Sequence, residues 1–338
     1  MDATIKDVAR VAGVSISTVS NALNGSKRVS PEKQAAVMAA VRQLGYVPNI
    51  NARLLKARRT GNIGLFLPYI DGPFFTSLIQ EIYHACADFG YGMFTHVARE
   101  FDSQQTAATM LSCNIDAAIV LNDHLLDSEI SMLCARGLPL VFKDRRICQC
   151  GVGSILLDNN ATEQEVAYLA HTGHKRIAYL RGRNNHDGNE RYEAFLRGMA
   201  AVQLPVDELL IMEGEFAYKV AYNCVYSLYQ YPKPIMPDAI LCANDEMALG
   251  CIAALTDMGY SVPRDVSVLG FDDMGAATCV PPLTTVSYSM RDFAHMAVEE
   301  AVRLIADPKS EGNCRILPSE MVLRKSVSFR YGDIPNIR

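Results

Sequence analysis

The sequence predicts a small all-α helix-turn-helix head followed by a larger α/β core with two lobes, each built on a doubly wound parallel sheet. Three observations lead to this fold class. The first 45 residues contain three short helical segments with a glycine turn, basic residues concentrate in the first 60, and apolar strands alternate with helical segments from residue 61 onward. The 338 residues, 49% hydrophobic and 20% charged, suffice for several domains with cores of their own.

Two classes of protein do not fit this composition. No apolar run reaches the ~18–20 residues that span a membrane, and the start MDATIKDVAR lacks the basic and apolar regions of a secretory signal. We therefore expect a cytoplasmic, nucleoid-associated protein. Ten cysteines are scattered after residue 85 without a CxxC pair, Cys148-x-Cys150 being the nearest spacing, so we expect them to be reduced.

The head begins with two short helices separated by a glycine. Thr4 with Asp7 three residues later is a variant of the capping box, which predicts a helix to about residue 12. Gly13 permits a sharp turn, and a second helix follows over residues 15–23. A Ser-Pro cap and a glycine stop delimit the third helix, which ends at residue 44.

This arrangement is typical of a DNA-binding helix-turn-helix. The distribution of charge also indicates DNA binding. The first 60 residues carry ten Lys/Arg and three Asp/Glu, a net charge of +7, whereas the remaining residues carry a net charge of −12. Such asymmetry favours a head that binds a polyanion, attached to an acidic body.

The second helix has two sides at 100° per residue. Three apolar residues cluster on the core side: Val19, Ala22 and Leu23. The opposite side carries Ser17 and Asn21, flanked by Ile16 and Ser20. Asn21 can form hydrogen bonds with an adenine edge, and Ile16 can contact a thymine methyl group. The alternative is that the polar residues are an ordinary solvent-exposed surface and that Ile16 is a partly buried residue that packs against the helix end. Phosphate contacts are expected from Thr18, Asn24 and Lys27.

Residues 49–57 form a basic segment that contains the paired leucines Leu54 and Leu55. A helix of this length is too short to be stable alone. The segment therefore indicates a helix that folds only against a partner, or else a solvated linker.

The body alternates strands and helices, which predicts parallel doubly wound sheets in two lobes. Strands are expected near residues 62–68, 91–97, 116–122, 138–144, 152–158, 176–182, 208–213, 238–243 and 266–273, with helices between them. Ligands of such sheets bind beyond the carboxyl ends of the strands. The aromatic, amide, carboxylate and arginine side chains there suit a polar, hydroxyl-rich molecule.

The head and the body both carry motifs of one family. TIKDVARVAGVSISTVSNALNG, RVSPE, GYVPN and ARLLK resemble the head of the lactose/purine repressor (LacI/GalR) family. GPFF, HTGHKRIAYL, ANDEMALG, VPRDVSVLGFDD and PPLTTVSY resemble its effector core, which is similar to type I periplasmic sugar-binding proteins. The resemblance covers about residues 4–330.

The resemblance implies a division of labour along the chain. Residues 1–48 would bind DNA, residues 49–60 would form a hinge helix and linker, and residues 61–338 would bind the effector and dimerise. The hinge helix would pair with its twin in the minor groove, where Leu55 wedges between bases beside Lys56. Base-reading positions fall on Ile16, Ser17 and Asn21. Lobe 1 would comprise about 61–158 and 288–322, and lobe 2 about 159–287 and 323–332.

The resemblance also implies a set of effector contacts. They fall on Phe74, Phe75, Asn122, Asp144, Arg191, Phe216, Asn244 and Asp272. The guanidinium group of Arg191 would bind ligand oxygens, Asp272 would form hydrogen bonds with hydroxyls or ring nitrogens, and Phe216 would stack on the ligand. Alternatively, each of these residues only caps the end of a strand or fills the hydrophobic core. The chain has no Trp. We expect a carbohydrate in preference to a nucleobase, and we interpret Arg181 and Arg183 as surface residues rather than as an anion site.

Catalytic and metal-binding motifs are missing. The sequence has no G-x-S-x-G, Walker A, G-x-G-x-x-G or H-E-x-x-H pattern, and His171-x-x-His174 has no partner ligands at suitable spacing. We expect neither enzyme activity nor a cofactor or metal. A tyrosine stripe over residues 218–229 is core or dimer surface, and no leucine heptad follows the core, so we expect a homodimer.

The sequence therefore favours a repressor of transcription that binds a near-palindromic operator under the control of a small molecule. Two alternatives remain: a solute-binding protein without DNA function, and an α/β enzyme that modifies sugars or nucleotides. The first leaves the basic head unexplained, and the second requires a catalytic constellation.

Overall fold

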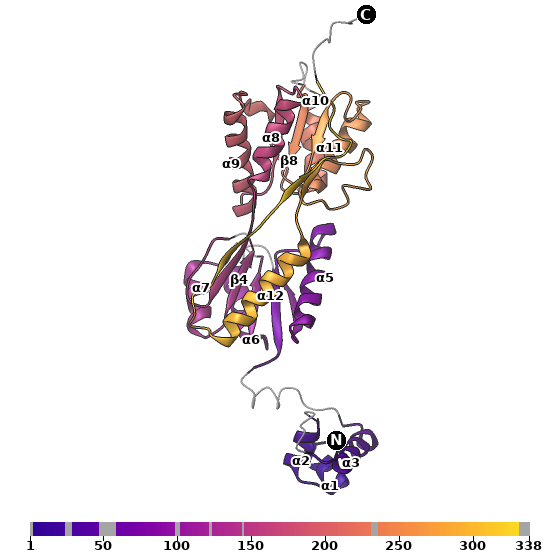
Figure 1. Ribbon diagram of the computed structural model, residues 1–338, viewed down its shortest axis with the longest axis vertical. Helices are drawn as coiled ribbons and strands as arrows, with labels where there is room; N and C mark the ends of the chain where they lie inside the picture. Colours follow the sequence, from indigo (N-terminus) through magenta and orange to yellow (C-terminus); the bar gives the residue numbers. More distant parts are fainter. Residues whose placement is uncertain are drawn as a thin grey trace, which may run out of the picture. The chain divides into compact units, whose positions relative to one another are not determined.

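The computed structural model describes residues 3–23, 29–46, 59–98, 102–121, 124–143, 145–230 and 236–330. The chain divides into two compact units, Met1–Thr60 and Gly61–Arg338, each considered by itself (Figure 1). Within the described ranges, no helix is long and apolar enough to cross a membrane.

The N-terminal unit is a three-helix domain. It contains α1 (Ile5–Ala12), α2 (Ile16–Leu23) and α3 (Pro31–Leu44), in agreement with the predicted helices. Thr4 and Asp7 form a reciprocal capping box at the start of α1, and Gly13 ends that helix in the left-handed region with a φ of 66°. The small core is built from one buried valine on each helix, Val8, Val19 and Val37, together with alanines.

Lobe 1 of the large unit is a six-stranded parallel sheet in the order β11-β5-β4-β3-β1-β2. Its strands are β1 (Asn62–Leu67), β2 (Gly92–Val97), β3 (Ala117–Val120), β4 (Leu140–Lys143), β5 (Val152–Leu157) and β11 (Cys314–Leu317). Its helices are α5 (Gly72–Asp88), α6 (Ser103–Ser112), α7 (Asp127–Ala135) and α12 (Met290–Ala306). Helices α5 and α12 cover one face and α6 and α7 the other, which buries both faces.

Lobe 2 repeats this plan with a four-stranded parallel sheet in the order β7-β6-β8-β9. Its strands are β6 (Ile177–Arg181), β7 (Ile211–Glu213), β8 (Ala239–Cys242) and β9 (Ser267–Leu269). Its helices are α8 (Ala161–His171), α9 (His186–Ala201), α10 (Tyr218–Tyr229) and α11 (Asp245–Asp257), and a 3-10 turn (Glu208–Leu210) precedes β7. Helix α8 packs with α9, and α10 packs with α11.

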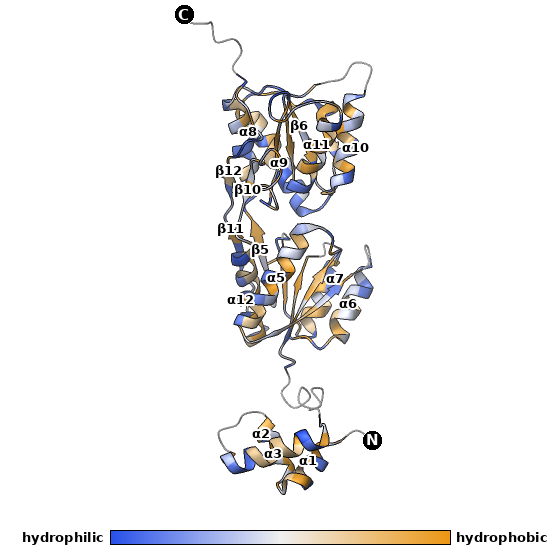
Figure 2. Cartoon of the chain, turned by 90° about the vertical axis from the view of Figure 1, so that its right-hand side faces the viewer, coloured by the Kyte–Doolittle hydropathy of each residue, from blue (hydrophilic) through white to orange (hydrophobic). Residues whose placement is uncertain are grey.

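The chain crosses between the lobes three times. The first crossing follows β5, the second joins β10 (Thr285–Ser287) to α12, and the third joins β11 to β12 (Glu320–Val322). Strands β10 and β12 pair in antiparallel fashion beside the crossings (Figure 2). Such a set of connections between two separately folded sheets is the kind of place where a hinge can absorb a change of angle.

The predicted fold class is confirmed, but the cysteine prediction is wrong for one pair. Cys148 and Cys314 form a disulfide, with a Cα–Cα distance of 6.0 Å across a sequence separation of 166 residues. Sequence spacing could not reveal this proximity, because β11 returns to lobe 1 after the second crossing and pairs with β5. The other eight cysteines are free.

Candidate functional site

The exposed side of α2 carries the predicted base-reading residues. Ser17 and Asn21 are exposed, Ile16 keeps 45% of its surface accessible, and Thr18 is half-buried. Their helix is held firmly: the Ser15 hydroxyl accepts a hydrogen bond from the Thr18 amide at 3.1 Å. The other predicted DNA-binding residues, Asn24, Lys27, Leu55 and Lys56, lie outside the described residues.

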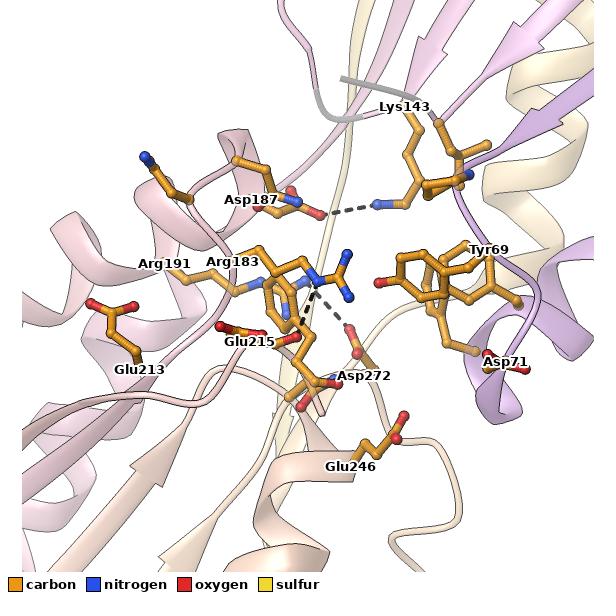
Figure 3. Close-up of a pocket in the computed structure, with 18 of the residues that line it drawn as sticks. Tyr69, Asp71, Lys143, Arg183, Asp187, Arg191, Glu213, Glu215, Glu246 and Asp272 are labelled. Carbon is orange, nitrogen blue, oxygen red and sulfur yellow. Dashed lines mark hydrogen bonds and ion pairs between the residues drawn. The ribbon is translucent and has the colours of Figure 1, made fainter. Parts of the chain in front are cut away.

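A cavity of about 760 Å³ lies between the two lobes of the large unit, at the carboxyl ends of strands from both sheets (Figure 3). Its lining combines aromatic rings, amides and charges. The carboxylates are Asp71, Asp187, Glu213, Glu215, Glu246 and Asp272, and the cations are Lys143, Arg183 and Arg191. Six of the predicted effector contacts line it: Phe74, Phe75, Arg191, Phe216, Asn244 and Asp272. The other two, Asn122 and Asp144, fall outside the described part of the chain.

Arg191 is anchored in the cavity wall and is only 3% exposed. Its Nε donates to Asn159 Oδ1 at 3.2 Å and its Nη1 donates to the carbonyl of Ala243 at 2.5 Å. Its Nη2 pairs with Asp272 Oδ1 at 3.4 Å. Three of the five guanidinium N–H groups therefore form hydrogen bonds within the protein, and two remain for a ligand.

Asp272 is fixed from two sides. It receives the Arg191 guanidinium and the Tyr288 hydroxyl, which donates at 3.2 Å. Its backbone φ of 107° is unusual for a residue with a side chain and is typical of functional sites. Burial raises the pKa of Asp272, against the opposing effect of Arg191. The carboxylate is thus held in one orientation at the cavity.

Phe216 is presented by a strained turn. Glu215 and Phe216 have φ values of 56° and 57°. The ring lies on Gly182, where a β-carbon would fall 2.1 Å from it, so only glycine fits there. Asn244 supports the turn, because its Nδ2 donates to the carbonyl of Phe216 at 3.3 Å while its Oδ1 caps α11.

Phe74 and Phe75 differ in their environment. Phe75 is buried and packs edge-on against Tyr69, with a centroid distance of 4.5 Å. Phe74 is half-buried, and the Lys143 ammonium lies 5.5 Å from the centre of its ring. Phe74 is therefore the better placed of the two to contact a ligand.

Two contacts span the cleft, between residues that lie at the strand ends where a ligand was expected but whose pairing was not predicted. Lys143, the last residue of β4, pairs with Asp187 in the first turn of α9 at 3.1 Å, and their side chains are 5% and 14% exposed. Burial raises the pKa of Asp187, but Lys143 and Arg191 outweigh it, and the net shift is downward. The Arg183 guanidinium lies 4.7 Å from the centre of the Tyr69 ring. Arg183 therefore lines the cavity and is half-buried rather than fully exposed.

His174, from the His171-x-x-His174 spacing, is part of the core of lobe 2. It is buried, its Nε2 lies 2.8 Å from the Ser267 hydroxyl, and burial lowers its pKa. Among the described residues, no group of three His, Cys, Asp or Glu side chains could hold a metal ion.

Comparisons with known proteins cover both units. Residues 4–49 match the lacI family of bacterial regulatory proteins, and residues 166–327 match the periplasmic binding protein-like domain. The HTH-type transcriptional repressor PurR of Haemophilus influenzae (strain ATCC 51907 / DSM 11121 / KW20 / Rd) is 32% identical over 337 residues, covering 96% of this chain and 98% of that protein. PurR of Mannheimia succiniciproducens is 31% identical over 332 residues, with the same coverage.

Solved structures agree. The lac repressor dimer bound to operator and the anti-inducer ONPF has a TM-score of 0.85 at 25% identity, covering 97% of this chain and 100% of that one. The complex of the transcriptional regulator CelR with cellobiose has a TM-score of 0.71 at 28% identity, covering 96% and 99%. The chain therefore belongs to the lacI family of bacterial regulatory proteins, as a DNA-binding transcriptional repressor with a periplasmic-binding-like core and not an enzyme.

Proposed function

We propose that this repressor binds a near-palindromic operator as a homodimer, and that a carbohydrate in the inter-lobe cavity controls its affinity for that operator. The observation that carries the proposal is the cavity itself, whose wall takes aromatic faces, amides and carboxylates from both lobes. A ligand that contacts both lobes favours one angle between them.

On the DNA side, α2 would enter the major groove with Ile16, Ser17 and Asn21 toward the base edges. Thr18, Asn24 and Lys27 would contact phosphates. Two paired hinge segments, with Leu55 and Lys56, would occupy the minor groove between the half-sites. The dimeric, operator-bound lac repressor among the structural neighbours supports this arrangement. Such a repressor works beside the nucleoid, in the cytoplasm.

On the ligand side, the charge balance favours a neutral, hydroxyl-rich molecule. Six carboxylates face three cations, and Lys143 and Arg191 are already paired with Asp187 and Asp272. Carboxylates accept hydrogen bonds from hydroxyl groups, whereas an additional anion would be repelled. The Phe216 and Phe74 rings can pack against the C–H faces of a sugar. A structural neighbour in complex with cellobiose agrees with this class.

A nucleobase is the second candidate. The full-length relatives named PurR favour it. Phe216 could stack on a planar base, and the fixed carboxylate of Asp272 could accept two N–H groups. We place the carbohydrate first because the cavity lining offers six carboxylates that can accept hydrogen bonds from hydroxyl groups.

A thermal-shift screen of the full chain separates these classes, because a ligand of the native state raises the melting temperature. The probes are cellobiose, glucose, ribose, glucose 6-phosphate, guanine and hypoxanthine. We expect a neutral sugar to raise the melting temperature of the wild type and to have no effect on Asp272→Ala. A response to a purine alone would replace the carbohydrate with the second candidate.

Operator binding needs its own control. DNA selected from genomic fragments should bind the wild type and lose affinity for Asn21→Ala, which keeps the thermal response to the ligand. Selected DNA that binds wild type and Asn21→Ala equally well would contradict the role of α2.

A further inference from the structure

Four cysteines gather in lobe 1, away from the cavity. Cys134 lies near the end of α7, Cys148 and Cys150 lie between β4 and β5, and Cys314 begins β11. Cys148 and Cys314 are bonded to each other, and a β-carbon on Gly151 would lie 3.9 Å from the Cys134 sulfur. None of the four lines the cavity, and all four lie in the large unit.

The bonded pair is accessible and depends on the fold. Cys148 is exposed and Cys314 is half-buried, so oxidants and reductants can reach the bond. Cys150 is also exposed, but the structure pairs Cys148 with the distant Cys314 and leaves Cys150 free. Burial, followed by the neighbouring Cys150, raises the pKa of Cys134, which makes Cys134 a poor nucleophile.

A bacterial cytoplasm keeps thiols reduced, and disulfides that form there are usually transient or redox-sensing. We propose that Cys148 and Cys314 are a reversible, peroxide-sensitive thiol pair. The inference rests on the proposed cytoplasmic location, and it is independent of the identity of the ligand.

The chemistry balances with a peroxide as the oxidant. The exposed Cys148 thiolate attacks the O–O bond, becomes a sulfenic acid and releases an alkoxide, or hydroxide in the case of hydrogen peroxide, which takes up a proton from solvent. The Cys314 thiol then attacks the sulfenic sulfur, forms the disulfide and releases water. An external dithiol, such as reduced thioredoxin, returns two electrons and two protons and becomes a disulfide itself.

The Cys148–Cys314 disulfide would join a segment that leads from the cavity to a strand that leads to a crossing between the lobes. Segment 145–151 follows β4, whose last residue Lys143 lines the cavity. Strand β11 leads to the third crossing, where the Ser319 hydroxyl donates to the carbonyl of Asp158 at 2.5 Å. The Ile147 amide donates to the Ser154 hydroxyl at 3.0 Å, a contact that does not depend on the disulfide and should keep the segment in place after reduction. Oxidation should therefore slow amide hydrogen exchange in residues 145–151 several-fold without changing the fold.

The test counts thiols in the full chain. Denatured, reduced protein should show ten titratable thiols, matching the ten cysteines, and protein treated with one equivalent of hydrogen peroxide should approach eight. Mass spectrometry after trypsin should find peptide 147–175 linked to peptide 310–315. Reduced thioredoxin should restore the full count.

Three variants assign the bond, since peptide 147–175 contains two cysteines. Cys148→Ser should lose no thiols to peroxide, and Cys314→Ser should lose only the Cys148 thiol, as an unresolved sulfenic acid. Cys150→Ser should still lose two. The proposal is overturned if peroxide leaves every thiol free, if the bond joins Cys148 to Cys150, or if protein isolated from cells holds a Cys148–Cys314 bond that excess thioredoxin does not open.

Discussion

The ion pair between Lys143 and Asp187 should control closure of the cleft, because it joins the two lobes. At a separation of 3.1 Å and an effective dielectric constant of about 20, the gross attraction is about 5 kcal/mol. Removing one partner of a buried pair costs about 3–5 kcal/mol, since the other charge stays desolvated. Because Lys143 and Asp187 lie on different lobes, moving the lobes apart would break the pair. Lys143→Met should therefore shift the equilibrium toward the open form by about 3 kcal/mol, or roughly 100-fold.

This shift sets the expected effect on ligand binding. A ligand that binds only the closed form loses affinity in proportion to the population of that form, so the dissociation constant should rise by up to roughly 100-fold. Isothermal titration calorimetry of the full chain measures it with the sugar found by the thermal screen. Lys325→Met is the matched control, because Lys325 is an exposed lysine of the large unit.

A double-mutant cycle with Asp187→Asn isolates the pair from other effects of each substitution. A change of less than twofold for Lys143→Met, or a coupling energy near zero, would refute the role of this pair. The pH dependence gives a second check. Because the pKa of Asp187 is lowered in the folded state, its contribution is present above the unfolded value near 3.8 and is lost only below it. Asp187 should therefore cause no loss of ligand affinity between pH 8 and pH 5.

Three further substitutions test the cavity, the hinge segment and a buried glutamate. Arg191→Ala should abolish the response to the ligand and preserve operator binding, and an intact response would contradict the cavity assignment. The same substitution should lower the free energy of unfolding, measured by denaturant titration, by about 3–5 kcal/mol, because Asp272 stays buried without its partner. Leu55→Ala should weaken specific operator binding several-fold or more in gel shifts while calorimetry shows unchanged ligand affinity; a collapse of ligand affinity would contradict the hinge assignment. Glu165 is fully buried without a partner for either carboxylate oxygen, and burial, followed by Asp245, raises its pKa. Unfolding at pH 8 then releases a proton and is favoured, so Glu165→Gln should raise the melting temperature at pH 8 and lose this advantage near pH 4.5; an equal effect at both pH values would show that Glu165 is ionised in the fold.

Local chemistry made much of the fold predictable from the sequence. The first helix begins and ends where Thr4, Asp7 and Gly13 require it. The angular argument for α2 placed Val19 in the core and Asn21 in solvent because the period of a helix is fixed. Nine of the ten strands in the two sheets lie within their predicted ranges, since strands buried on both faces appear as continuous apolar runs. The exception is β11 (Cys314–Leu317), for which the sequence predicted no strand.

The relations between the lobes could not be predicted in this way. The pairing of Lys143 with Asp187 depends on the angle between two separately folded sheets, which no local pattern encodes. The orientation of Arg191 is similar, because its partners Asn159, Ala243 and Asp272 come from three crossing or loop segments. Lys143 lies at the end of a buried strand, and lysine is rarely buried without a partner. This position was the available signal that Lys143 pairs with an acidic residue.

A ligand between the lobes should change how strongly the helix-turn-helix binds DNA. Fluorescence anisotropy measures it directly, as the dissociation constant of the full chain for its selected operator with and without saturating ligand. We expect this dissociation constant to change at least fivefold with the ligand, and not to change for Arg191→Ala. An operator affinity that stays the same while the ligand saturates the cavity would contradict the account.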